Sequence, residues 1–146
     1  MTHALPFAAG LIAALVNILI ARTLPRKRAA EFFNLFMAAT SAFYFGSALP
    51  AGNASILVVE IAISAMLFGL AFAGQWWSLK FTAIAFVAHG AWDLAHVTLG
   101  LGANAGTVFP VICVAYDWMI AGYLWWMASA FEGEKRQAAA SQAERP

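Results

Sequence analysis

Five residues that can hold a proton or a metal ion lie in stretches of the sequence that are otherwise apolar. They are Glu60, His89, Asp93, His96 and Asp117. Inside a membrane a carboxylate or imidazole is costly, so such residues are by default candidates for a functional site. No Lys or Arg lies within these apolar stretches. We therefore expect protons or a bound cation to neutralise the carboxylates.

The spacing of these residues predicts a single site. His89, Asp93 and His96 are spaced i, i+4, i+7, and on an α-helix they form one stripe about 60° wide. Glu60 and Asp117 lie on two other predicted helices. With a rise of about 1.5 Å per residue, all three carboxylates reach a similar depth, about 9–10 Å below the outer ends of their spans.

Three chemical interpretations of this site remain open. The carboxylates can be ionised around a divalent metal ion, with His89, Asp93, His96 and Asp117 as ligands. They can instead be partly protonated in a static hydrogen-bonded core. The His-Asp-His line can also relay protons. We favour the metal site.

A bound metal would give the site a catalytic role. It can lower the pKa of a water molecule or polarise a substrate oxygen, while one of the carboxylates acts as general base. The candidate catalytic residues are Asp93, Asp117 and Glu60. Trp92 and Trp118 adjoin the two aspartates in sequence, and we expect their indole rings to line a cofactor pocket. A site between membrane helices favours a lipid-like or apolar substrate.

The elements that position these residues are predicted to be transmembrane helices. The chain has 146 residues, of which 63% are hydrophobic and only 10% are charged, against about 25% charged in a soluble domain. Apolar runs long enough to cross a membrane occur at 5–24, 32–49, 54–74, 81–99 and 110–131. The runs do not alternate as β-barrel strands do, so the predicted fold is an all-α bundle of five transmembrane helices.

Basic residues predict the orientation of this bundle. All eight fall on one side of the five-span topology, which places the N-terminus outside and the C-terminus in the cytoplasm. They are Arg22, Arg26, Lys27, Arg28, Lys80, Lys135, Arg136 and Arg145. Residues 1–131 form one transmembrane domain, and we expect the polar tail 132–146 to be disordered.

Two further patterns concern contacts between the helices. Asn17 and Asn34 lie within apolar runs, and we expect them to form interhelical hydrogen bonds. Small residues that recur every four positions also suggest contact faces. These are Ala38, Ala42 and Gly46 in one span, and Ala65, Gly69 and Ala73 in the next.

A family resemblance supports this choice of site residues. The segment from His89 through Trp92 and Asp93 to His96, with a later Cys113-x-x-x-Asp117 element, resembles a family of small bacterial integral membrane proteins of unknown function. That family's pattern is His-x-x-Trp-Asp-x-x-His-His, and Val97 stands here in place of its last His. The resemblance covers about 31–127, includes Glu60, and implies a multi-pass protein of the bacterial inner membrane.

Other functions remain compatible with the sequence. The same residues would serve a proton-coupled carrier or channel, and the chain would also suit an accessory subunit of a larger membrane complex or a homo-oligomer. We expect membrane lipid as a partner. We expect no nucleic acid, because no basic patch of the required kind is present.

Overall fold

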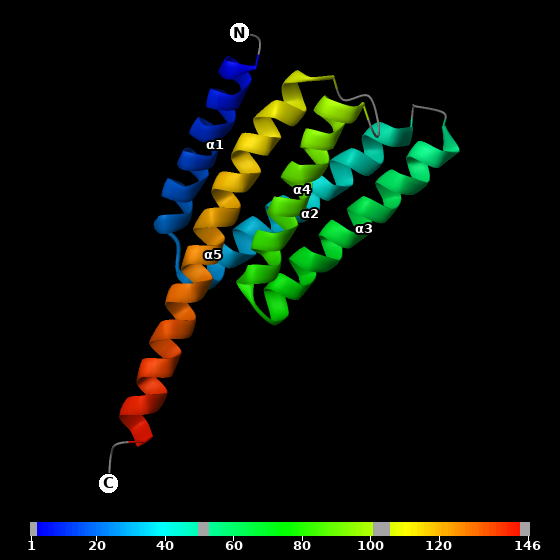
Figure 1. Cartoon of the computed structure of the whole chain (residues 1–146). Coiled ribbons are helices and arrows are strands. Elements are labelled where there is room, and N and C mark those ends of the chain that lie inside the picture. The colour runs from blue at the N-terminus through cyan, green and yellow to red at the C-terminus, as the bar shows by residue number, and fades with distance from the viewer. Residues whose placement is uncertain (1–2, 50–52, 101–105, 144–146) are drawn as a thin grey trace.

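The chain is a bundle of five α-helices. The computed structural model describes residues 3–49, 53–100 and 106–143, and every regular element within them is a helix. The helices are α1 (Ala4–Arg22), α2 (Arg26–Ala48), α3 (Ala54–Trp76), α4 (Leu79–Leu99) and α5 (Val108–Ala143). Consecutive helices run in opposite directions (Figure 1). The all-α prediction is confirmed, and each helix contains most or all of one predicted apolar run.

Polar and conformationally special residues set the helix ends. The Asn53 side chain accepts hydrogen bonds from the backbone N–H groups of Ser55 and Ile56, which caps the start of α3. Ser78 accepts from the Lys80 N–H at the start of α4. Gly100 ends α4 at φ 65°, a left-handed conformation that glycine adopts without steric cost.

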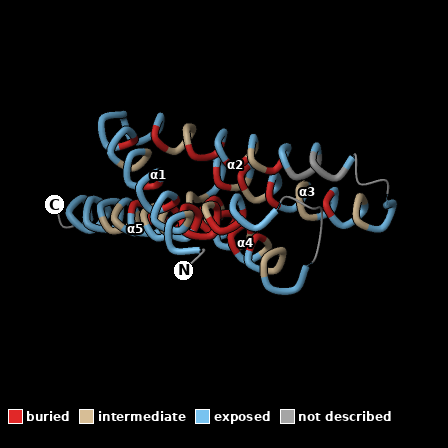
Figure 2. The backbone as a smooth tube through the Cα atoms, turned by 90° about the horizontal axis from the view of Figure 1, so that it is seen from above, coloured by how far each residue is buried: buried red, intermediate tan, exposed pale blue. Residues whose placement is uncertain are grey.

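Helices α4 and α5 form the centre of the bundle, with α1 packed against α5 and α3 packed against α4. The most extensive contacts are those of α4 with α5, α1 with α5, α2 with α3, and α3 with α4. Figure 2 shows the buried residues concentrated where these helices face one another. The largest apolar side chains that are fully buried come from α2, α3, α4 and α5: Phe33, Met37, Leu67, Phe86, Ile120 and Leu124.

Both predicted asparagines make interhelical hydrogen bonds, as expected. The Asn17 amide on α1 donates to the Tyr116 hydroxyl on α5 at 2.7 Å. The Asn34 amide on α2 donates to Gln75 on α3 at 2.7 Å, and its carbonyl accepts from the Thr82 hydroxyl on α4. The bonds of Asn34 join α2, α3 and α4. They lie toward the end of the bundle that carries the basic residues Arg26 and Lys80, which we call the basic end.

Three of the described helices, α1, α3 and α5, are long and apolar enough to cross a membrane. Large apolar side chains are also exposed on the outer faces of the bundle, including Leu5, Phe72 and Val58. A membrane location is therefore plausible. The other two helices carry more polar residues, because α2 begins with three basic residues and α4 contains two histidines and an aspartate.

The expectation of a disordered tail is wrong for residues 132–143, where α5 continues as a helix. This segment is rich in Ala, Gln and Glu, all strong helix formers. Ion pairs also hold it against other helices: Lys80 Nζ lies 2.7 Å from Glu132, and Arg26 lies 2.9 Å from Glu134. The tail is thus part of the basic end of the bundle.

Candidate metal centre

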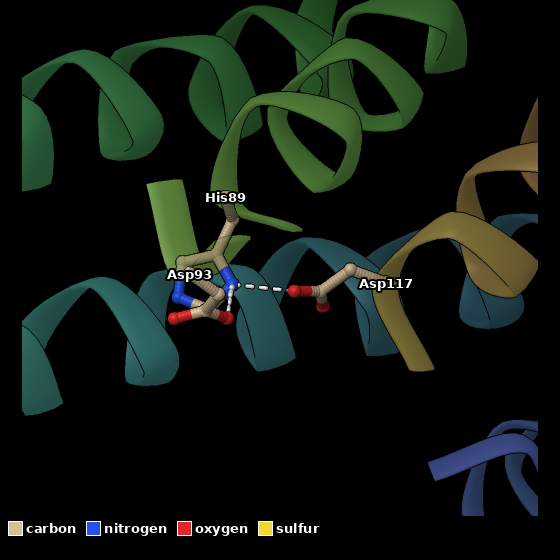
Figure 3. Close-up of side chains that lie close together, drawn as sticks. All are labelled: His89, Asp93 and Asp117. Carbon is tan, nitrogen blue, oxygen red and sulfur yellow. Dashed lines mark hydrogen bonds and ion pairs between the residues drawn. The ribbon is translucent and has the colours of Figure 1, made fainter. Parts of the chain in front are cut away.

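Helices α4 and α5 bring three of the predicted residues together. His89 Nδ1 lies 2.5 Å from Asp117 Oδ2 and 3.4 Å from Asp93 Oδ2 (Figure 3). His89 and Asp93 are one helical turn apart on α4, and Asp117 faces them from α5. One imidazole nitrogen therefore faces two carboxylates.

This cluster is buried and compact enough to hold an ion. The exposed fraction of the side chain is 0% for His89, 0% for Asp93 and 3% for Asp117. One ligand atom from each residue can be chosen so that all three lie within 4.8 Å of one another. Two carboxylates this close in a desolvated site repel each other, so a cation or protons must offset their charge.

Gly90 allows α5 to approach α4 at this point. A Cβ placed on Gly90 would lie 2.7 Å from Trp118 Nε1 and 3.3 Å from the Cβ of Asp117. Any side chain here would therefore push away the part of α5 that carries Asp117. Sequence reasoning missed Gly90, although a glycine directly after a candidate ligand in an apolar helix is a signal of close helix contact.

Glu60 and His96 form a second polar cluster together with Trp92. His96 Nε2 lies 3.2 Å from Glu60 Oε1, and the Trp92 indole N–H donates to Glu60 Oε2 at 3.3 Å. The Glu60 side chain is fully buried and that of His96 is 4% exposed. Trp92 thus contacts a carboxylate, but this carboxylate belongs to Glu60 and not to the adjacent Asp93.

The hydrogen bonds of His96 determine where a proton resides. His96 Nδ1 lies 2.9 Å from the Trp92 carbonyl oxygen. A carbonyl can only accept, so Nδ1 carries a proton. The contact between Nε2 and Glu60 then needs one more proton, which belongs either to an imidazolium or to a carboxylic acid. In both cases the pair holds a transferable proton and has no net charge.

The structure thus divides the predicted metal ligands. His89, Asp93 and Asp117 lie together, whereas His96 pairs with Glu60. The group whose ligand atoms lie within 4.8 Å of one another consists of His89, Asp93 and Asp117. The His96 imidazole is directed instead at Glu60 on α3, with Nε2 3.2 Å from Oε1.

The remaining candidates lie around this centre. The Trp118 indole N–H donates to the Val87 carbonyl at 3.4 Å, and its side chain is 46% exposed. Trp118 therefore lies against the outer surface of α4 beside Gly90. Cys113 is buried on α5, one turn before Asp117 and next to Asp93.

Together these observations define a class of protein: an all-helical bundle with helices able to span a membrane and a buried His/Asp/Asp cluster able to hold a metal ion. Residues 5–130 match a family of unknown function (DUF6010), and the chain belongs to this family. The match begins earlier in the chain than the resemblance described above. No curated protein and no solved structure gives a match.

Proposed function

We propose that this chain is a multi-pass protein of the bacterial inner membrane, in which all five helices cross the bilayer. The alternating helix directions support this topology. The described basic residues lie at the end of α1, at the starts of α2 and α4, and in the C-terminal part of α5. The ion pairs of Arg26 and Lys80 with α5 indicate that these segments meet at one end of the bundle. By the positive-inside rule this end is cytoplasmic, and the N-terminus lies outside.

We further propose that His89, Asp93 and Asp117 bind a divalent metal ion. The observation that carries this proposal is the convergence of one imidazole and two carboxylates in a fully buried cluster. No Lys or Arg occurs in the sequence between Lys80 and Lys135, so the two carboxylates have no nearby fixed cation on their own helices. A divalent ion would neutralise both while His89 binds as the neutral imidazole.

The ligand set favours a catalytic centre over a purely structural one. Three protein ligands are typical of catalytic zinc sites, where a water molecule or substrate takes the fourth position. A bound ion would supply a nucleophilic water or polarise a substrate oxygen. His96 lies on the same face of α4 as His89 and Asp93, and its pair with Glu60 on α3 would hold the proton that such chemistry needs. We propose an enzyme acting on a lipid-like or apolar substrate.

Metal-dependent thermal unfolding tests the binding proposal. At a free metal concentration of about 100 times Kd, a single site stabilises the folded state by about 2.7 kcal/mol. For a chain of this length that raises Tm by about 5–10 °C. We expect this shift with Zn²⁺ or Mn²⁺ in wild type and in His96→Gln, which keeps a hydrogen-bond donor toward Glu60. We expect no shift in Asp93→Asn or Asp117→Asn.

If His96→Gln lost the metal-dependent rise in Tm while the two aspartate variants kept it, the assignment of ligands would be contradicted. An equal shift in wild type and in both aspartate variants would place the metal elsewhere. Each Asp→Asn change preserves side-chain shape, so far-UV circular dichroism and monodispersity of the apo variants control for folding.

A second candidate, a proton carrier or channel, is favoured by one observation. His89 lies between two carboxylates, and the His96–Glu60 pair continues this line of proton-holding groups along α4. Proton flux into liposomes measures it directly. Flux that is lost in both His89→Ala and Glu60→Gln, with no metal bound to wild type, would favour the relay over the metal centre.

A further inference from the structure

The basic end of the bundle contains a pocket that is separate from the polar clusters. It is a cavity of about 480 Å³ between the start of α2, the turn that joins α3 to α4, and the C-terminal part of α5. These segments meet at the lower end of the bundle in Figure 1. The pocket therefore lies at the end of the helices where a membrane would meet the cytoplasm.

Positive charge dominates the rim of this pocket. Arg26, Lys27 and Lys135 line it, and Glu132 is the only carboxylate among its lining residues. Glu132 is already bonded to Lys80, at 2.7 Å. Within the described part of the chain, Lys27 and Lys135 form no ion pair with a carboxylate. Two cationic side chains are thus available to an anion.

The rest of the pocket is apolar and aromatic. Trp76, Trp77, Met127 and Phe131 line it, and the two tryptophans are 70% and 79% exposed. The Lys135 ammonium lies 4.2 Å from the centre of the Phe131 ring, which holds this cation at the pocket. Exposed tryptophans at the end of apolar helices are typical of the membrane–water interface.

We propose that this pocket binds the head group of an anionic phospholipid. Lys27 and Lys135 would contact the phosphate, and the aromatic side chains would contact the glycerol backbone and the first carbons of the acyl chains. Basic pockets between transmembrane helices on the cytoplasmic side bind anionic head groups in this way. The combination of a cationic rim with exposed tryptophans favours a lipid over a soluble anion. The proposal rests on the membrane location and is independent of the metal centre.

Native mass spectrometry in a mild detergent measures this binding. The protein is titrated with phosphatidylglycerol, and with phosphatidylcholine of the same acyl chains as the neutral reference. Each basic residue near a membrane surface contributes about 1 kcal/mol. We therefore expect phosphatidylglycerol to bind about 5-fold more weakly to Lys27→Gln, and about 30-fold more weakly to the Lys27→Gln/Lys135→Gln variant.

The matched control is Arg22→Gln/Arg136→Gln, which removes the same charge from the same end of the bundle but outside the pocket lining. We expect its affinity for phosphatidylglycerol to stay within a few-fold of wild type. Equal loss in both double variants would indicate diffuse attraction and would overturn the proposal, as would unchanged affinity in Lys27→Gln/Lys135→Gln. Metal content, measured on the same samples, is expected to be equal in all of them, so the two proposals fail separately.

Discussion

Gly90→Ala tests whether the close approach of α4 and α5 holds the candidate metal centre together. The added Cβ would lie 2.7 Å from Nε1 and 2.8 Å from Cδ1 of Trp118, and 3.3 Å from the Cβ of Asp117. Non-bonded carbon atoms settle at about 3.5–4.0 Å. The half-exposed Trp118 ring can rotate away, but Asp117 Cβ moves only with the backbone of α5. We expect α5 to shift by several tenths of an ångström.

The energetic result follows from two opposing effects. Overpacking of this kind costs about 1–3 kcal/mol, and replacing glycine within a helix returns about 1 kcal/mol. Gly90→Ala should therefore lower the free energy of unfolding by up to about 2 kcal/mol. The shift also separates Asp117 from His89, and we expect metal affinity to fall about 10–100-fold, as when a supporting contact of a metal ligand is lost.

The assay is denaturant unfolding in mild detergent with and without added metal. Gly122→Ala on α5 is the control, because a Cβ there meets no atom within 4 Å. It should be neutral or slightly stabilising, with unchanged metal affinity. If Gly90→Ala behaves like Gly122→Ala in both measurements, the close approach at Gly90 does not position the centre.

Three further predictions concern residues toward the basic end of the bundle. Gly74→Ala should destabilise by about 3 kcal/mol in denaturant unfolding, because its Cβ would overlap the Thr82 hydroxyl and lie 3.0 Å from the Thr82 backbone nitrogen. Asn34→Ala should cost about 1–3 kcal/mol in the same assay, since its two partners on α3 and α4 lose their hydrogen bonds. The hydrogen bond from Lys80 lowers the pKa of Glu132, so the stability that this pair adds is present above the ordinary glutamate pKa of about 4.3 and is lost as pH falls through the lowered value. The Tm difference between wild type and Glu132→Gln should accordingly be present at pH 7 and vanish in acid.

Apolar runs in the sequence predicted the helices, because hydrophobic patterning acts over short distances along the chain. Asn53, Ser78 and Gly100 lie at helix ends that their side chains or backbone conformations favour. The one-turn spacing of His89 and Asp93 predicts that they lie together, but the matched depth of Glu60 and Asp117 does not decide which of these two carboxylates joins them.

Contacts that depend on helix rotation were less predictable. The stripes of small residues at Gly46 and Gly69 suggested close helix faces, yet a Cβ on either glycine would meet no atom within 4 Å. The tight approaches occur instead at Gly10, Gly74 and Gly90, where a Cβ would overlap the Ile112 carbonyl oxygen, the Thr82 hydroxyl and the Trp118 ring, respectively. Glycine spacing along one helix does not specify which face the partner helix covers.

The pairing of His96 with Glu60 was likewise not predictable, because it depends on how the helices are placed relative to one another. The stripe of three groups on α4 predicts a single ligand set, but in the structure His96 Nε2 lies 3.2 Å from Glu60 Oε1, apart from the group of His89, Asp93 and Asp117. Which carboxylate meets which end of the stripe depends on the relative heights of α3 and α5, and these heights are set by packing across the whole bundle.

Elemental analysis of the purified protein tests the central claim most directly. The protein is purified in mild detergent, and bound metal is measured per chain by mass spectrometry for wild type, Asp93→Asn, Asp117→Asn and His96→Gln. The account predicts about one divalent ion per chain in wild type and in His96→Gln, and a large loss in both aspartate variants. Substoichiometric metal in wild type that is unchanged in Asp93→Asn would contradict it.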